Sequence, residues 1–216
     1  MRIHMMVQYS GDWWEARRGK VTASNADRIL TPTGKPSAQQ DDYAAELVGE
    51  QFVFDPNFLT EKPMSTAMRH GRDTEPEARD WYAADRKARV QMVGGVQSEC
   101  GRWWASPDGL IRDDKTWLGG LELKCPIPKT HVKYLIANAL PPEYRPQVHF
   151  QLLVTKLPFV EFVSYCRGMR ALVVRVHPDA FTERLAAELE AFDRKYRAAL
   201  AAVTEGVAAT PGGDSR

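Results

Sequence analysis

One short segment, residues 119–126 with the sequence Gly-Gly-Leu-Glu-Leu-Lys-Cys-Pro, constrains the fold of this chain more than any other. Glycines and a proline bound a mainly apolar run of strand length, which favours a β-strand. Side chains alternate between the two faces of a strand. We therefore expect Leu121 and Leu123 to point into the core. Glu122 and Lys124 should then lie together on the opposite face.

A second acid, Asp108, precedes this strand within residues 106–110, Ser-Pro-Asp-Gly-Leu. If the two segments belong to one hairpin, Asp108 lies beside Glu122. Carboxylate oxygens suit Mg²⁺ and Mn²⁺, and two carboxylates with a lysine at a sheet edge can position a metal-bound water against a phosphodiester. Pro-Asp-Gly is also a strong turn sequence. Without Glu122, the turn interpretation would be preferred for Asp108.

An acid two positions before a lysine is not a specific signal, since about one Glu-x-Lys is expected by chance in a chain of this length. Three other acidic triplets have the same spacing: Asp85-Arg86-Lys87, Asp113-Asp114-Lys115 and Asp193-Arg194-Lys195. The first and third follow helix-like runs, and the second has the composition of a polar turn. Only Glu122-Leu123-Lys124 lies in an apolar run, where the competing interpretation is a half-exposed strand with a surface salt bridge.

Composition places few limits on function. The chain has 216 residues, of which 44% are hydrophobic and 26% charged, as in ordinary globular proteins. It contains no apolar run of membrane-spanning length. The formal net charge of +1 is weak evidence against tight coating of DNA but allows a local basic surface. The three cysteines form no C-x-x-C pair, which argues against a zinc or iron–sulfur site and favours reduced thiols in the cytoplasm.

Five segments resemble the motifs of one known family. They are residues 14–24 (Trp-Glu-Ala-Arg-Arg-Gly-Lys-Val-Thr-Ala-Ser), 71–75 (Gly-Arg-Asp-Thr-Glu), 106–110, 120–126 and 144–148 (Tyr-Arg-Pro-Gln-Val). Their combination and order are far more specific than any one of them. The chain thus resembles the phage lambda exonuclease type of viral recombinase nuclease, within the PD-(D/E)xK restriction-endonuclease-like superfamily. The likeness is poor at residues 31–63 and after residue 155.

This resemblance implies an α/β fold with a restriction-endonuclease-like core, in which helices flank a mixed central β-sheet. The residue pattern agrees, and it predicts one domain over residues 1–203 and a disordered tail at 204–216. Expected helices are a short one beginning near Ser24, then 41–52, 65–85 (kinked or restarted at Pro76), 129–139, 143–155 and 179–203. Expected strands are 89–96, 103–107 and 118–125 in an antiparallel meander, then 159–166 and 172–177; a loop is expected at 54–63.

The resemblance also implies a metal site formed by Asp108, Glu122 and the main-chain carbonyl of Leu123. It would hold two Mg²⁺ ions, which Mn²⁺ can replace. Lys124, kept charged by the neighbouring acids, would orient the attacking water and stabilise charge on the phosphate. A proton relay through Lys124 is the alternative, if the site is dry enough to lower its pKa.

Two residues on expected helices join this set by resemblance. Glu75 would reach the metal ions directly or through water, whereas the plain interpretation is a solvated helix acid. Gln147 would complete the site, and it is preferred to Gln151, one turn later. Tyr144 shares a helix face with Gln147 and either contacts the same phosphate or packs.

Arg17, Ser24 and Ser106 form a second set. A guanidinium, two hydroxyls and a helix N-terminus suit a terminal phosphate, and the resemblance implies a pocket for the 5′-phosphate of DNA. Taken singly, Ser24 can be a helix cap, Ser106 a strand-end serine and Arg17 a surface charge. Arg18 competes in register, but Arg17 stands seven positions before Ser24, as in the family motif.

Residues and resemblance together predict a Mg²⁺-dependent exonuclease that degrades one strand of linear double-stranded DNA from 5′ to 3′. It would release 5′-mononucleotides and leave a 3′ single strand for recombination. The resemblance further implies a homotrimeric ring, a single-strand annealing protein as partner, and a phage or prophage gene expressed in the cytoplasm of a bacterial host. The alternatives are an endonuclease on the same core and a catalytically inactive module that binds DNA ends.

Overall fold

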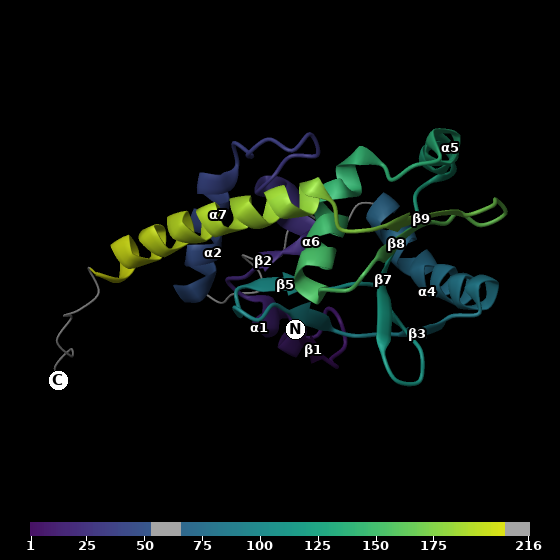
Figure 1. Ribbon diagram of the computed structural model, residues 1–216, viewed down its shortest axis with the longest axis horizontal. Helices are drawn as coiled ribbons and strands as arrows, with labels where there is room; N and C mark the ends of the chain where they lie inside the picture. The colour runs from purple at the N-terminus through teal and green to yellow at the C-terminus, as the bar shows by residue number, and fades with distance from the viewer. Residues whose placement is uncertain (53–65, 206–216) are drawn as a thin grey trace.

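The computed structural model describes residues 1–52 and 66–205, whose strands form two sheets (Figure 1). The loop expected at 54–63 and most of the tail expected at 204–216 lie outside the described residues. The four-stranded sheet has the order β1 (Arg2–His4), β4 (Gly95–Gln97), β5 (Trp103–Ala105), β2 (Val21–Thr22). The five-stranded sheet has the order β3 (Arg89–Gln91), β6 (Gly109–Arg112), β7 (Trp117–Lys124), β8 (Val160–Ser164), β9 (Leu172–Val176).

Both sheets are mixed, as the expected fold class requires. In the five-stranded sheet β7 and β8 are parallel, and the other neighbours are antiparallel. In the four-stranded sheet β2 is parallel to β5, and the other pairs are antiparallel. The central strand β7 therefore joins an antiparallel hairpin on one side to a parallel pair on the other.

The segment expected as one strand at 89–96 is divided between the two sheets. β3 pairs with β6, whereas β4 pairs with β1 and β5. Gly94 and Gly95 mark the crossing: a Cβ at Gly95 would lie 2.3 Å from the Trp104 ring, and one at Gly94 would lie 2.2 Å from Met6. The expected antiparallel meander is therefore wrong, because tight packing at these glycines carries the chain from one sheet to the other.

Helices surround both sheets. They are α1 (Gly11–Arg17), α2 (Gln40–Phe52), α4 (Thr66–Arg86), α5 (Pro128–Ala137), α6 (Arg145–Thr155) and α7 (Ala180–Thr204), with short 3₁₀ turns η1 (Ala23–Arg28) and η2 (Pro142–Tyr144). The helices predicted from 41 onwards are all present within a few residues of the expected bounds. α4 contains Pro76 and continues as one helix instead of restarting there.

The helix expected near Ser24 is different. The first helix, α1, lies earlier in the chain, and the Ser10 side chain caps it by accepting a hydrogen bond from the Trp13 N–H. Ser24 lies inside η1, whose N-cap is Thr22, and that residue makes no side-chain capping bond. The helix-cap interpretation of Ser24 is therefore wrong.

Helix α6 lies between the two sheets, and Figure 1 shows it at the centre of the molecule. It contacts η1, β5 and α7 on one side and β7 and β8 on the other. Every residue of α6 except Arg145 and Gln147 is buried, as expected of a helix that is covered all round. Since α4 also contacts β7, the central strand has helices on both of its faces, and its residues 119–123 are all buried.

Helix α7 runs beside α2 and continues past the body of the molecule towards the C-terminus (Figure 1). Asp179 begins it with a reciprocal capping box: its carboxylate accepts from the Phe181 and Thr182 N–H groups, and the Thr182 hydroxyl accepts from the Asp179 N–H. Such a cap stabilises a helix by about 1 kcal/mol. The buried side chains of α7 form a stripe that closes the core over the four-stranded sheet: Phe181, Leu185, Leu189 and Phe192.

Candidate active site

The β6–β7 hairpin brings Asp108 opposite Glu122. Gly109 pairs with Leu121, so the residue before β6 faces the residue after Leu121. The Asp108 N–H donates to the Leu121 carbonyl at 3.0 Å, and the carboxylate Oδ2 of Asp108 accepts from the Leu123 N–H at 2.6 Å. The predicted juxtaposition of the two acids is therefore present. The bounds of the preceding strand differ from those expected: the predicted strand covered 103–107, whereas β6 begins at Gly109.

Glu122 is buried and holds three side-chain donors. It is 1% exposed, although a half-exposed strand was the competing interpretation. Its Oε1 lies 2.5 Å from Lys124 Nζ and accepts from Gln147 Nε2 at 2.6 Å. Its Oε2 accepts from Gln151 Nε2. A carboxylate held by three donors has one fixed orientation, and Oε2, with a single donor, can still accept another partner.

Gln151 was set aside in favour of Gln147, yet both reach the same carboxylate. The two residues are four positions apart on α6 and so lie on one face of the helix. Gln151 is fully buried, and its Oε1 has no hydrogen-bond partner among the described residues. Only the packing of α6 against β7 reveals its role, because a helix glutamine carries no distinctive sequence signal.

Lys124 retains its positive charge. Burial favours the neutral amine, but the carboxylates of Glu122 and Asp108 outweigh it and raise the pKa of Lys124 above its ordinary value. The Nζ atom also lies 5.0 Å from the centre of the Tyr144 ring, and that ring packs against Phe162 at 5.2 Å. Tyr144 therefore packs in the core and also borders the lysine. A charged lysine is suited to orienting water and stabilising anionic oxygen, and it is unsuited to accepting a proton.

Glu75 reaches the site from α4 together with Arg79, a residue that the sequence did not single out. Arg79 Nη2 pairs with Glu75 Oε1, and Arg79 Nε donates to the Asp108 carbonyl at 3.0 Å. The guanidinium thus ties α4 to the start of β6. Burial raises the pKa of Glu75; Arg79 opposes the shift and the charge of Glu122 adds to it.

The acids outnumber the cations in this cluster. Burial, followed by the charges of Glu122 and Glu75, raises the pKa of Asp108 well above its ordinary value, although Lys124 and the Leu123 N–H act in the opposite direction. Acidic groups shifted by burial and by one another are typical of functional sites. The excess of negative charge is what a divalent cation would neutralise.

The donors present fit a metal ion that keeps much of its water. Within the described ranges, no three His, Cys, Asp or Glu side chains form a group that could hold a metal ion by themselves. Asp108 and Glu122 offer carboxylates, and the Leu123 carbonyl projects to the same strand edge as its N–H, which is the edge bearing Asp108. Mg²⁺ typically binds one or two carboxylates and retains several waters, so this set suits it better than it suits a fully protein-bound ion.

Ser106 is half-buried and takes part in a polar network with Trp13 and Trp104. Its hydroxyl donates to the Gly94 carbonyl at 3.0 Å and accepts from the indole N–H groups of Trp13 at 3.1 Å and Trp104 at 2.8 Å. One proton and two lone pairs are all that a serine hydroxyl offers. In this structure Ser106 therefore positions Trp13 and the segment that leads to Asp108.

Arg17 lies on the other side of Trp13. Its guanidinium carbon is 4.2 Å from the centre of the Trp13 ring. It lines a pocket of about 270 Å³ whose other walls include Arg18, Lys20 and Thr22. Ser24 is exposed beside that pocket, with its hydroxyl 3.3 Å from the Thr22 hydroxyl. The register competitor, Arg18, pairs with Glu15 at 2.9 Å.

The other acidic triplets have structural explanations. Asp113 forms the β6–β7 turn by accepting from the backbone N–H groups of Lys115 and Thr116. Asp193 pairs with Arg102 and Arg197.

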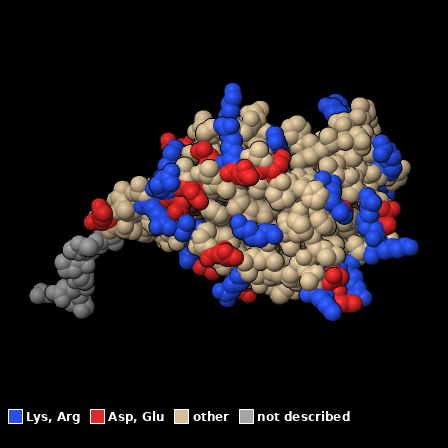
Figure 2. Space-filling model, in the orientation of Figure 1, with Lys and Arg blue, Asp and Glu red and all other residues tan. Residues whose placement is uncertain are grey.

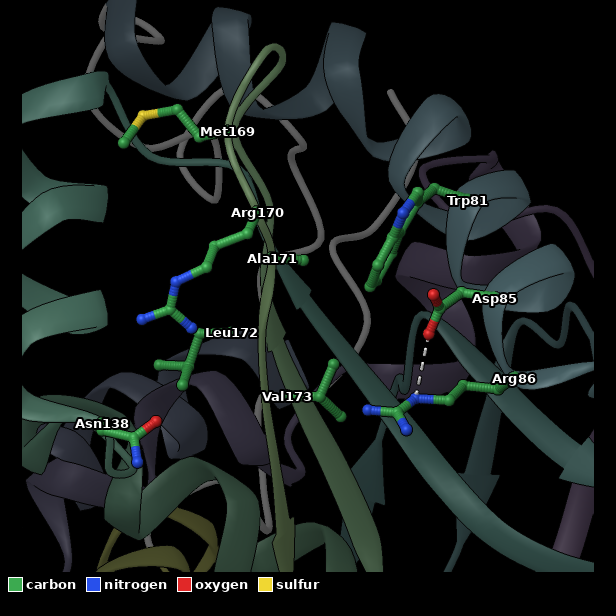
Figure 3. Close-up of a pocket in the computed structure, with 9 residues that line it drawn as sticks. All are labelled: Trp81, Asp85, Arg86, Asn138, Met169, Arg170, Ala171, Leu172 and Val173. Carbon is green, nitrogen blue, oxygen red and sulfur yellow. Dashed lines mark ion pairs between the residues drawn. The ribbon is translucent and has the colours of Figure 1, made fainter.

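Asp85 and Arg86 pair with each other at 3.4 Å at the end of α4, where they help line a cavity of about 510 Å³ beside β9 (Figure 3). In that view Trp81, Asp85 and Arg86 come from α4, and residues 169–173 form the facing wall. The cavity contains no acid–lysine pair comparable to the β7 site.

The surface does not display one basic patch on the face shown in Figure 2, where Lys and Arg are interspersed with Asp and Glu. This distribution agrees with the formal net charge of +1. A search of the described helices finds none that is long and apolar enough to cross a membrane.

The fold is α/β with a mixed sheet, and its central hairpin presents two acids and a lysine. This combination defines the restriction-endonuclease-like class of nucleases. Residues 12–158 match the model of the YqaJ-like viral recombinase domain, and the chain belongs to that family. The resemblance drawn from the motifs is thus confirmed. The family and the fold together support a nuclease that acts in DNA recombination. Comparison with curated proteins finds no match.

Several solved structures with the same fold are exonucleases. The alkaline exonuclease LHK-Exo from Laribacter hongkongensis is 28% identical, with a TM-score of 0.78 over 92% of this chain and 98% of that one. The same enzyme in complex with dAMP is 29% identical, with a TM-score of 0.77 and the same coverage of both chains (92% and 98%). A phage-related exonuclease from Haemophilus somnus 129PT is 12% identical, with a TM-score of 0.63 over 87% and 96% of the two chains, and it supports the fold alone.

Proposed function

We propose that the protein is a Mg²⁺-dependent exonuclease that degrades one strand of linear double-stranded DNA from its 5′ end. It would release 5′-mononucleotides and leave a 3′ single strand for recombination. One observation carries the proposal: a buried Glu122, fixed by Lys124 and two glutamines, faces Asp108 inside the fold of a viral recombinase family.

The residues divide the work by chemistry. Asp108, Glu122 and the Leu123 carbonyl would hold the divalent cation, which when bound supplies a Lewis acid and an activated water; by resemblance there are two such ions. Lys124 would orient that water and stabilise negative charge on the phosphate, because the carboxylates of Glu122 and Asp108 raise its pKa and favour the charged form. Glu75 pairs with Arg79 through Oε1, and its carboxylate can also accept a hydrogen bond from water at the rim of the site.

The two glutamines have a positioning role. Gln147 and Gln151 donate to different oxygens of Glu122, so the carboxylate cannot rotate away from the hairpin. Such fixed groups lower the cost of reorganisation during the reaction.

The polarity of cutting would come from the pocket beside α1. Arg17 supplies a guanidinium and Ser24 an exposed hydroxyl for the 5′-phosphate of the DNA end. Ser106 would contribute a third contact only if its proton left the Gly94 carbonyl. We therefore assign it mainly to the support of Trp13, on whose ring Arg17 rests.

The family also suggests the surroundings in which the enzyme works. We propose a homotrimeric ring that encloses the DNA, a single-strand annealing protein as partner, and action in the cytoplasm of a bacterial host. These proposals rest on family membership and not on any contact within one chain.

The decisive experiment is digestion of a linear duplex carrying a label at the 3′ end of the strand to be cut. Duplexes with 5′-phosphate and 5′-hydroxyl ends should be compared, each with Mg²⁺ and with a chelator. We expect shortening of the labelled strand and 5′-mononucleotide products, only with Mg²⁺, and faster on the phosphorylated end. Closed circular DNA of the same sequence is the matched control.

Two results would contradict the proposal. Equal rates on both ends, together with cutting of the closed circle, would indicate an endonuclease on the same core. Retention of DNA ends without any Mg²⁺-dependent product, at every pH tested, would indicate a binding module.

A further inference from the structure

Tyr9 has a backbone conformation that is unfavourable for its side chain. Its φ is +66°, in the left-handed region that suits glycine and asparagine. The other non-glycine residues with positive φ in the described ranges are Lys87, Asn138 and Lys156. Each of them directly follows a helix, where a left-handed residue is an ordinary terminator. Tyr9 precedes α1 and so has no such explanation.

Burial does not account for the choice of tyrosine either. Tyr9 is 51% exposed, so the core gains little from its ring. The ring is nevertheless held in place: the Arg72 guanidinium carbon lies 4.8 Å from its centre, and the Trp13 ring lies 5.0 Å away, tilted by 45°. A strained, exposed and supported aromatic side chain suggests a role outside folding.

The support places Tyr9 at the mouth of the acid cluster. Its neighbour Gln8 donates to the Pro107 carbonyl at 3.1 Å, directly before Asp108 in sequence. Arg72 stands one helical turn before Glu75 on α4. Burial and then the charges of Glu75 and Asp108 raise the pKa of the Tyr9 hydroxyl, which Arg72 and Lys124 oppose.

We propose that Tyr9 contacts the substrate, with its ring stacking on a base of the DNA end that enters the site and Arg72 facing the adjoining phosphate. This inference rests on the proposed function. A flat ring with no demand for a particular hydrogen-bond pattern fits an enzyme that must accept every base in turn. Arg72 is exposed and its guanidinium lies over the Tyr9 ring, so it can pair with phosphate while supporting the ring.

The test uses substitutions that separate the ring from the backbone. Tyr9→Asn removes the ring but tolerates the left-handed conformation, and Tyr9→Phe retains the ring without its hydroxyl. The substrate is a duplex with 2-aminopurine near its 5′ end, bound in Ca²⁺ to observe stacking and digested in Mg²⁺ to measure kcat and KM. Thermal unfolding of each variant provides the structural control.

We expect wild type and Tyr9→Phe to quench the 2-aminopurine equally and to differ by less than about twofold in KM. Tyr9→Asn should lose the quenching and raise KM about 10-fold or more, with a smaller change in kcat. Its melting temperature should be unchanged or higher, because the strained tyrosine is gone.

Quenching and KM that are unchanged in Tyr9→Asn, with normal cutting by both proteins, would overturn this assignment alone. A lower melting temperature combined with unchanged KM would overturn it too, and would make Tyr9 a structural residue. If wild type neither binds nor cuts duplex ends, the proposed function fails, and the assignment fails with it.

Discussion

The acid cluster at the end of β7 and the pocket beside α1 differ in burial and in how firmly their side chains are held. In the cluster, Glu122 is buried and each of its oxygens is held by at least one donor. The pocket is an open space lined by three cations together with the carboxylates of Glu46 and Glu50, and Ser24 is exposed beside it. A centre that must present the same geometry in every cycle is fixed from several elements. Under the proposed function, the open pocket would admit and release a chain end.

The largest effect should follow from removing the charge at the fixed centre. Lys124→Ala should lower the cleavage rate about 100- to 1000-fold while binding of DNA ends persists, because charge on the phosphate loses its stabiliser. Single-turnover digestion and a binding titration would measure the two effects. Lys115→Ala is the matched control, since Lys115 belongs to the exposed triplet in the hairpin turn. Near-normal turnover in Lys124→Ala would remove the assigned role.

Substitution of the two glutamines should have different main effects: loss of stability for Gln151 and loss of cleavage rate for Gln147. Gln151→Leu leaves Glu122 Oε2 without its buried donor, so it should cost about 1–3 kcal/mol in the free energy of unfolding. Gln147→Leu should cost less stability, since Gln147 is not fully buried, but should lower the cleavage rate about 10-fold or more. Urea unfolding would rank the two variants by stability, and initial rates would rank them by cleavage. The reverse ranking in stability would contradict the account of Glu122.

A change in the open pocket should alter substrate choice more than catalysis. Arg17→Ala should reduce the preference for 5′-phosphate over 5′-hydroxyl ends by about 10-fold, because one charge-assisted contact is lost. Digestion of 5′-hydroxyl ends should stay near the wild-type rate. Arg18→Ala is the control, because Arg18 is the neighbouring arginine that could be aligned with the family motif in place of Arg17. Equal loss of preference in both variants would place the phosphate elsewhere.

The smallest effect concerns pH. Asp108 and Glu75 have raised pKa values in the folded chain, so each binds its proton more tightly there than when unfolded. Their contribution to stability is therefore present at low pH and is lost as pH rises through the folded pKa. Metal binding needs ionised carboxylates, so the rise in melting temperature caused by Mg²⁺ should grow from mildly acidic to mildly alkaline pH. The same Mg²⁺ effect at every pH, or a pH trend that survives in Asp108→Asn, would contradict this.

The strand expected at 118–125, observed as β7 (Trp117–Lys124), and its pairing beside Asp108 could be predicted from sequence, because alternation and turn chemistry are local properties. The burial of Glu122 could not, since it depends on α4 and α6 covering opposite faces of β7. Gln151 and Arg79 were missed for the same reason: each reaches the site only through the packing of a whole helix.

Each difference from the expected structure has an identifiable cause. Ser24 has the residue type of a helix cap, yet the chain is already turned into η1 at Thr22. The division of 89–96 follows from contacts of Gly94 and Gly95 with residues elsewhere in the sequence, which no periodicity records. The phosphate contact assigned to Ser106 stays a prediction; in this structure two indoles occupy its lone pairs.

Helix α6 couples the alignment of Glu122 to the completion of the fold. It follows the hairpin that carries Asp108 and Glu122 in the chain, and it brings the two amides that fix the second of these acids. A copy in which α6 has not yet packed therefore has both acids and Lys124 but lacks an aligned carboxylate. Under the proposed function, cutting would begin only when the interior has closed.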